Sequence, residues 1–86
     1  MPSISTFYGI IIWMFYDDHQ PPHFHVEYAE FKAVFSIDTL LMTEGDLPRR
    51  TLSLVLEWAS LHRAELMADW DLCRKKQKPS KIPPLE

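Results

Sequence analysis

Residues 17–26 read DDHQPPHFHV, and this stretch separates an apolar segment from one in which polar and apolar residues alternate. Its two prolines lack a backbone N–H and cannot donate to a β-ladder, so a strand after this loop begins no earlier than His23. Side chains two residues apart on a strand point to the same face. We therefore expect His23 and His25 to point outward together, while Phe24 points into the core.

The segments on either side of this stretch have the composition of strands. Residues 4–16 are rich in β-branched and aromatic side chains and are apolar on both alternating faces, which indicates a strand covered on both sides, or on one side by a partner chain. Residues 31–38 and 40–43 predict a third and a shorter fourth strand, and Ala29-Glu30 predicts a tight turn between strands. Such brief connections favour an antiparallel meander.

The second half of the chain has helical spacing. Asp46 is a candidate cap and Pro48 suits a first helical turn. One apolar stripe runs through Val55, Ala59, His62, Leu66, Trp70 and Cys73. Because residues 49–74 contain no glycine or proline, the pattern predicts one long helix. A helix of that length either bends near residues 61–64 or projects and offers part of its stripe to a partner.

Together these patterns predict an α+β fold: a small antiparallel meander of three or four strands, followed by one long C-terminal helix, straight or bent, packed on the sheet. Residues 1–75 are expected to form a single domain, and residues 76–86 a tail rich in proline and lysine that is ordered only if Ile82 and Leu85 find a groove. The apolar content of 47% and aromatic content of 13% are typical of a globular protein.

Charge and cysteine content limit the classes of function. A net charge of −3 is not that of a protein that lives on nucleic acid, although residues 74–81 carry cations and no acid. The single cysteine, Cys73, excludes an internal disulfide and favours a cytoplasmic location. The apolar run over residues 7–16 is too short to span a membrane. The sequence leaves open whether the protein forms a homo-oligomer.

The histidine-rich stretch supports three interpretations. Imidazoles two apart on a strand, with Cβ atoms roughly 6–7 Å apart, can share a divalent metal ion, with His19 as a third ligand. The same pair, His23 and His25, can serve as general acid and base, with Asp18 orienting one ring. The plain alternative is that these histidines only hydrogen-bond loop backbone or aspartate carboxylates.

Two groups of cations are candidates for anion binding. Arg49 and Arg50 stand at the predicted helix start, where the helix dipole disfavours positive charge, so an external phosphate or partner carboxylate is a candidate ligand. The lysines of residues 75–81 are candidates for contact with RNA phosphates. For both groups the plain alternative is a solvated surface.

These motifs resemble those of a known family. The segments ISTFYGI (residues 4–10), DDHQPPHFHVEY (17–28), LPRR (47–50), LVLEWA (54–59) and LHRAEL (61–66) make nearly the whole chain similar to the bacterial domain-of-unknown-function 4160 family. The resemblance implies a small cytoplasmic protein, in some members described as the toxin of a type II toxin–antitoxin pair, and hence a small antitoxin encoded nearby. It supplies no established catalytic residue.

From the residues and the resemblance together we expect a toxin that acts on RNA or on translation. His23 and His25 would transfer protons or bind a metal, Asp18 would orient one imidazole, and Arg49 or Arg50 would hold a phosphate. The alternatives are a non-catalytic binding or regulatory module with structural histidines, and a small metal-binding protein.

Overall fold

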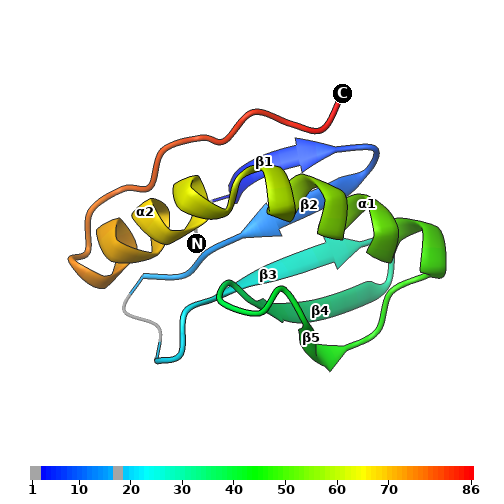
Figure 1. Ribbon diagram of the computed structural model, residues 1–86, viewed down its shortest axis with the longest axis horizontal. Helices are drawn as coiled ribbons and strands as arrows, with labels where there is room; N and C mark the ends of the chain where they lie inside the picture. Colours follow the sequence, from blue (N-terminus) through cyan, green and yellow to red (C-terminus); the bar gives the residue numbers. More distant parts are fainter. Residues whose placement is uncertain (1–2, 17–18) are drawn as a thin grey trace.

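The computed structural model describes residues 3–16 and 19–86. Five strands come first and two helices follow (Figure 1): β1 Ser3–Phe7, β2 Ile10–Trp13, β3 His23–Tyr28, β4 Phe31–Ser36, β5 Met42–Gly45, α1 Arg49–Leu61 and α2 Arg63–Arg74. Each strand pairs antiparallel with the next, so the sheet order is β1-β2-β3-β4-β5. The sheet is therefore a meander, but it has five strands where the sequence predicted three or four.

The additional strand arises because residues 4–16 do not form a single strand. The backbone turns at Tyr8 and Gly9, whose φ angles are 51° and 78°, and Phe7 pairs with Ile10. Positive φ at both central residues of a two-residue loop is the type I′ pattern, which suits a tight hairpin. The apolar run hid this turn, since both arms of the hairpin are apolar. By contrast, the turn predicted at Ala29-Glu30 is confirmed between β3 and β4.

The prediction of one long C-terminal helix is also wrong. The chain leaves helical geometry at His62, with φ −122° and ψ 25°, and α2 starts at the next residue. The His62 N–H still donates to the Trp58 carbonyl at 3.1 Å, so the break is a change of direction without a loop. Two short helices can each pack an apolar side against the twisted sheet, as the buried Val55 on α1 and Leu66 on α2 show. One straight helix of the same length could not follow the twist of the sheet over its whole length.

The start of α1 likewise differs from the sequence prediction. Pro48 is the residue that precedes the first helical turn, and Leu52 N–H donates to its carbonyl at 2.9 Å. Asp46 does not cap the helix. Its Oδ1 accepts a hydrogen bond from Leu47 N–H at 3.0 Å, in the turn before the helix.

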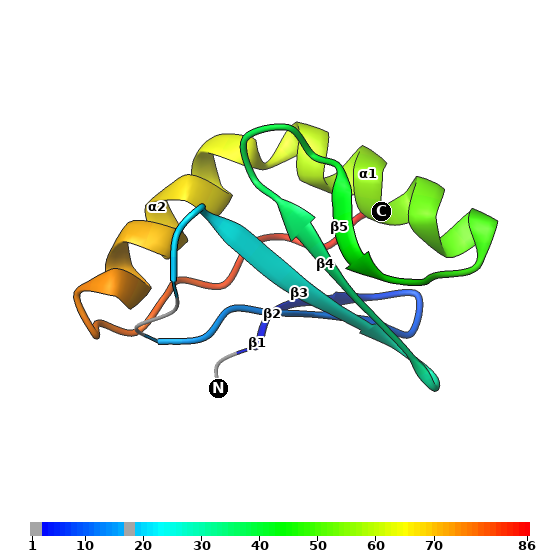
Figure 2. The ribbon, with the colours of Figure 1, turned by 90° about the horizontal axis from the view of Figure 1, so that it is seen from below.

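The core lies between the helices and one face of the sheet (Figure 2). Phe24 is fully buried there, as predicted, with its ring stacked on Phe35 at 5.4 Å between centroids and edge-on to Trp58 at 6.2 Å. Within residues 3–16 and 19–86, no helix or strand covers the opposite face, which we call the open face. None of the described helices is long and apolar enough to cross a membrane.

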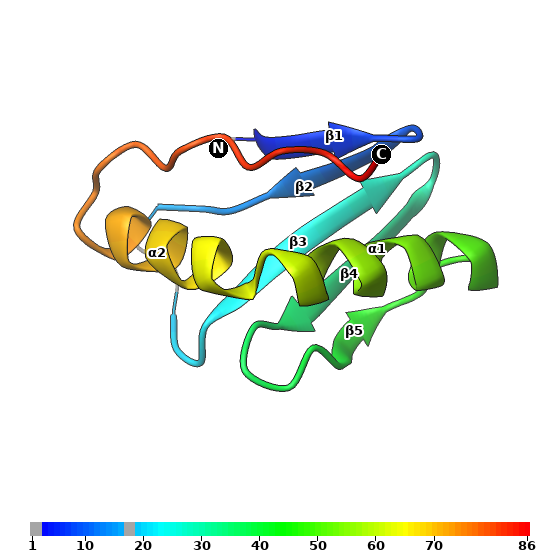
Figure 3. The same ribbon diagram turned by 45° about the horizontal axis from the view of Figure 1, so that its top comes forward.

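The segment after α2 runs back beside β1 (Figure 3). Ile82 is only 4% exposed, and its N–H donates to the Ile4 carbonyl at 2.8 Å. The indole N–H of Trp58 donates to the Pro83 carbonyl at 2.9 Å. Ser80 N–H donates to Asp69 Oδ1 at the same distance. Ile82 therefore packs within the core, and the half-buried Leu85 packs against it.

Candidate functional site

Three histidines converge at the end of the sheet where β3 begins. His19 lies on the loop before β3, His23 is the first residue of that strand, and His25 follows two residues later. The ring centroids of His19 and His23 are 5.2 Å apart, and those of His23 and His25 are 5.1 Å apart. The structure therefore brings together the three imidazoles that the sequence singled out, which we call the histidine cluster.

His23 is the buried member of the cluster. The sequence predicted that it would point outward, but it is only 6% exposed and its ring lies 5.1 Å from that of Trp70 on α2. Its Nδ1 is 2.8 Å from the Pro21 carbonyl. Because a carbonyl oxygen only accepts, the proton of a neutral ring resides on Nδ1, and Nε2 carries the lone pair. The cis peptide bond between Gln20 and Pro21 lies in this same loop.

His25 is the member that faces the open side of the sheet. Its ring is half-buried and stacks on Phe15 at 4.1 Å between centroids. It stands opposite Trp13 on β2 and Val34 on β4 in the strand register. Neighbouring side chains at opposed positions are close enough to interact, so these groups form a continuous surface across three strands.

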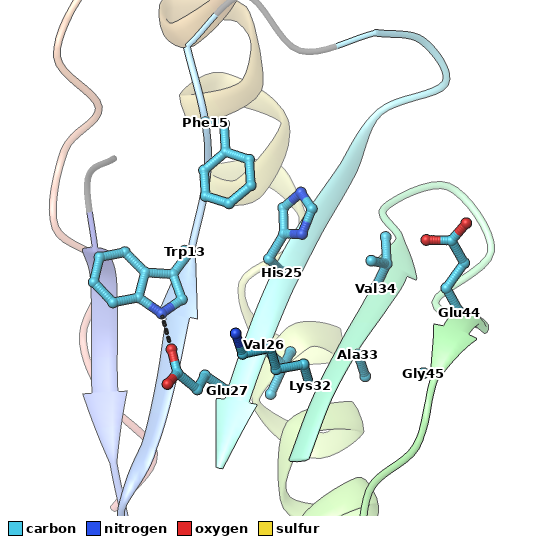
Figure 4. A pocket seen from close by; sticks show the side chains of 10 residues that line it. All are labelled: Trp13, Phe15, His25, Val26, Glu27, Lys32, Ala33, Val34, Glu44 and Gly45. Carbon is cyan, nitrogen blue, oxygen red and sulfur yellow. Dashed lines mark hydrogen bonds between the residues drawn. The ribbon is translucent and has the colours of Figure 1, made fainter. Parts of the chain in front are cut away.

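Two adjoining hollows extend along this surface. The first, which we call the histidine pocket, measures about 340 Å³ and is lined by Phe15, His19, Pro21, His23, His25, Val34, Ser36, Thr43 and Glu44. The second, the open-face groove, measures about 360 Å³ and is lined by Trp13, Phe15, His25, Val26, Glu27, Lys32, Ala33, Val34, Glu44 and Gly45 (Figure 4). Four residues line both hollows, namely Phe15, His25, Val34 and Glu44, so the two hollows share a wall.

The described part of the cluster bears on both metal binding and proton transfer. Among the described residues, no group of three or more His, Cys, Asp or Glu side chains is arranged to hold a metal ion. Asp17 and Asp18 lie outside the described residues, so the predicted role of Asp18 is not located. Two imidazoles at this spacing can still act as a proton donor and acceptor on one bound molecule.

The predicted anion-binding residues Arg49 and Arg50 do not join the cluster. Both are exposed at the start of α1, and that end of the molecule is opposite the end at which β3 begins (Figures 1 and 3). The cations at the cluster's end of the molecule are instead found at the end of α2 and directly after it. Arg74 lies one helical turn beyond Trp70, whose ring contacts that of His23, and the exposed Lys75 continues from it.

Several residues that line the two hollows were not identified from the sequence. Trp13 is half-exposed on the open face, and its Nε1–H donates to Glu27 Oε1 at 3.2 Å. Glu44, on β5, was not considered at all. Strand parity was a usable signal for Trp13 and Phe15, because residues two apart share a face. No signal in the sequence gave the register that aligns Glu44 with Val34.

Comparison with known proteins gives a family and nothing further. The family model described as "Domain of unknown function (DUF4160)" matches residues 9–71. No protein of curated function matches the chain, and no solved structure matches it. The matched range includes the histidine cluster, the open-face groove and most of both helices.

Proposed function

The chain belongs to the DUF4160 family, and we propose that it is the toxin-like component of a toxin–antitoxin pair, cleaving RNA at its histidine pocket in the cytoplasm. The observation that carries the catalytic part is the 5.1 Å separation between the ring centroids of His23 and His25, at the edge of a hollow that a nucleotide can enter. The toxin and antitoxin assignment rests on the resemblance stated for the sequence.

The proposed reaction is transfer of a phosphodiester within RNA. One imidazole acts as the base and takes the proton from a ribose 2′-OH as its oxygen attacks the adjacent phosphorus. The bond from phosphorus to the 5′-oxygen breaks, and the other imidazole, protonated, gives its proton to that leaving oxygen. The products are a 2′,3′-cyclic phosphate and a free 5′-OH. Orientation of one imidazole by Asp18 stays a prediction.

Binding of the substrate is assigned to two neighbouring features. A nucleobase can stack on the half-buried aromatic surface that Phe15 and His25 form, as bases stack on aromatic platforms of other single-strand binders. The exposed Arg74 and Lys75 stand at the end of α2, which lies at the cluster's end of the molecule, and can contact phosphates. Arg49 and Arg50, at the opposite end, are left for a second anion or for a partner's carboxylates.

The test compares two histidine variants in cells and in vitro. His25→Ala changes a half-buried side chain inside the cluster, while His62→Gln changes a histidine at the α1–α2 junction, outside it. We expect wild type and His62→Gln to arrest growth and cleave a labelled single-stranded RNA, and His25→Ala to lose about 10²–10⁴-fold in cleavage rate, the contribution of one positioned acid or base. Equal cleavage by a folded His25→Ala protein, or no cleavage by wild type, would overturn the proposal.

The burial of His23 favours a second candidate, a non-catalytic binding module with structural histidines. A 6% exposed imidazole that hydrogen-bonds the Pro21 carbonyl is what a purely structural role requires. Under this candidate His23→Ala lowers the melting temperature, whereas His25→Ala leaves every biological effect of the protein unchanged. Loss of growth arrest in folded His25→Ala protein excludes it.

A further inference from the structure

We propose that the open-face groove is a docking site for an extended, arginine-bearing segment of a partner protein. The proposal concerns the part of the surface from Trp13 to Glu44, and it holds whether or not the histidine cluster cleaves RNA. It rests on three observations: a fixed aromatic wall, carboxylates on two sides, and a strand edge over which an extended chain can enter.

The aromatic wall suits a cation. Trp13 is half-exposed and its indole is fixed by the hydrogen bond from Nε1–H to Glu27 Oε1 at 3.2 Å (Figure 4). The stacked rings of Phe15 and His25 continue this wall toward the histidine pocket. Guanidinium groups bind over aromatic faces and most strongly over tryptophan, so an arginine side chain is the matching chemistry.

The charges of the groove point to the same ligand. The exposed Glu44 on β5 stands opposite Val34, and Glu27 on β3 stands opposite Lys32, the cation among the lining residues, so the two carboxylates outnumber the lysine. A guanidinium has five N–H donors and binds carboxylates with paired hydrogen bonds. Glu27 lines the groove but not the histidine pocket, so RNA phosphates are less favoured here than in the pocket.

The position of the groove explains why an extended segment is expected. β5 is an edge strand that pairs only with β4, and its residues Glu44 and Gly45 line the groove. An edge strand presents unpaired backbone groups, and an extended peptide can pair there while alternate side chains reach over the sheet face. Ile11 and Trp13 of β2 are half-exposed on the open face, and cover by a partner chain on one side is one of the two alternatives that the sequence allows for this segment. The chain's own C-terminal segment lies beside β1, at the other edge.

The experiment uses the full chain and a synthetic probe. The probe is a capped hexapeptide, Ser-Val-Arg-Val-Arg-Ser, and its control carries neutral citrulline in place of both arginines. Binding is followed through the indole N–H signal of Trp13 in ¹H–¹⁵N spectra, assigned by its loss in Trp13→Phe. We expect saturable shifts with the arginine peptide and, because two charge-assisted contacts are removed, about tenfold weaker binding to the Glu27→Gln/Glu44→Gln double variant.

Matched controls keep the proposal falsifiable. Glu57→Gln neutralises an exposed glutamate on α1, on the covered side of the sheet, and should bind the arginine peptide as wild type does. Equal binding of the arginine and citrulline peptides, or unchanged affinity of the double variant, would refute the proposal. So would shifts of the Trp13 signal with an RNA oligonucleotide but not with the peptide, or with protein concentration alone, which would assign the groove to RNA or to a second copy.

Discussion

Replacing Ile82 by alanine tests whether the C-terminal segment is part of the folded core. Ile82 is 4% exposed and packs with the core residues, so its truncation removes buried methyl groups and leaves a cavity. Substitutions of this kind cost about 2–5 kcal/mol. The hydrogen bond from the Ile82 N–H to the Ile4 carbonyl does not involve the side chain and is retained, so we expect the lower part of that range, about 2–3 kcal/mol.

That loss is large for a protein of 86 residues. At about 0.05–0.15 kcal/mol per residue, the free energy of unfolding is roughly 4–13 kcal/mol. Urea unfolding followed by tryptophan fluorescence is the assay, since Trp58 hydrogen-bonds the Pro83 carbonyl in the same segment. With a urea dependence of about 1–1.5 kcal/mol per molar, the midpoint should fall by roughly 2 M.

The control for this prediction is Pro84→Ala, because Pro84 is exposed two residues away in the same segment. Its free energy of unfolding should stay within about 0.5 kcal/mol of wild type, as for most surface substitutions. If Ile82→Ala is equally close to wild type, then the segment does not stabilise the core and the described packing is refuted.

Further substitutions test two separate contributions to the free energy of unfolding, the steric fit of the glycines at positive φ and the burial of the Asp69 carboxyl. Gly45→Ala should lower the free energy of unfolding by at least about 2 kcal/mol, because its Cβ would lie 2.1 Å from the Lys32 carbonyl oxygen. Gly9→Ala, also at positive φ, should cost only about 1 kcal/mol, because its Cβ would meet the Tyr28 ring at an ordinary contact distance of 3.6 Å. Equal losses in urea titrations would refute the steric argument. Burial raises the pKa of the Asp69 carboxyl, against the lowering effect of the Ser80 N–H, so the folded state holds this proton more tightly than the unfolded state. Wild type therefore loses stability relative to Asp69→Asn as the pH rises from about 4 through the raised pKa; a difference in melting temperature that does not change with pH would count against this.

The alternation of side chains along a strand gave the sequence-based predictions that the structure confirms best. The alternation after the two prolines places the start of β3 at His23 and the ring of Phe24 in the core, and both are confirmed. The reason is local: proline cannot donate to a ladder, and the period of a strand is two. The grouping of the three histidines was likewise visible, because loop and strand positions so close in sequence remain close in space.

The errors arise where the local sequence does not by itself decide the structure. The hairpin at Tyr8-Gly9 lies within a run that is apolar on both sides of the turn, and a glycine in such a run is as compatible with a bulge in one strand as with a turn between two. The break at His62 follows from covering a twisted sheet, since residues 49–74 contain no helix breaker. Burial of His23 depends on Trp70, which is far away in the sequence, so alternation alone predicted an outward ring.

The most direct test of the central claim follows the histidine rings themselves. Protein labelled in its imidazole nitrogens is titrated with a short single-stranded RNA, and the ring signals are assigned by single substitutions. If the cluster is the substrate site, the signals of His19, His23 and His25 shift together and saturate, while that of His62 stays in place. Saturable binding that leaves the three cluster signals unmoved, or that moves His62 alone, would contradict the account.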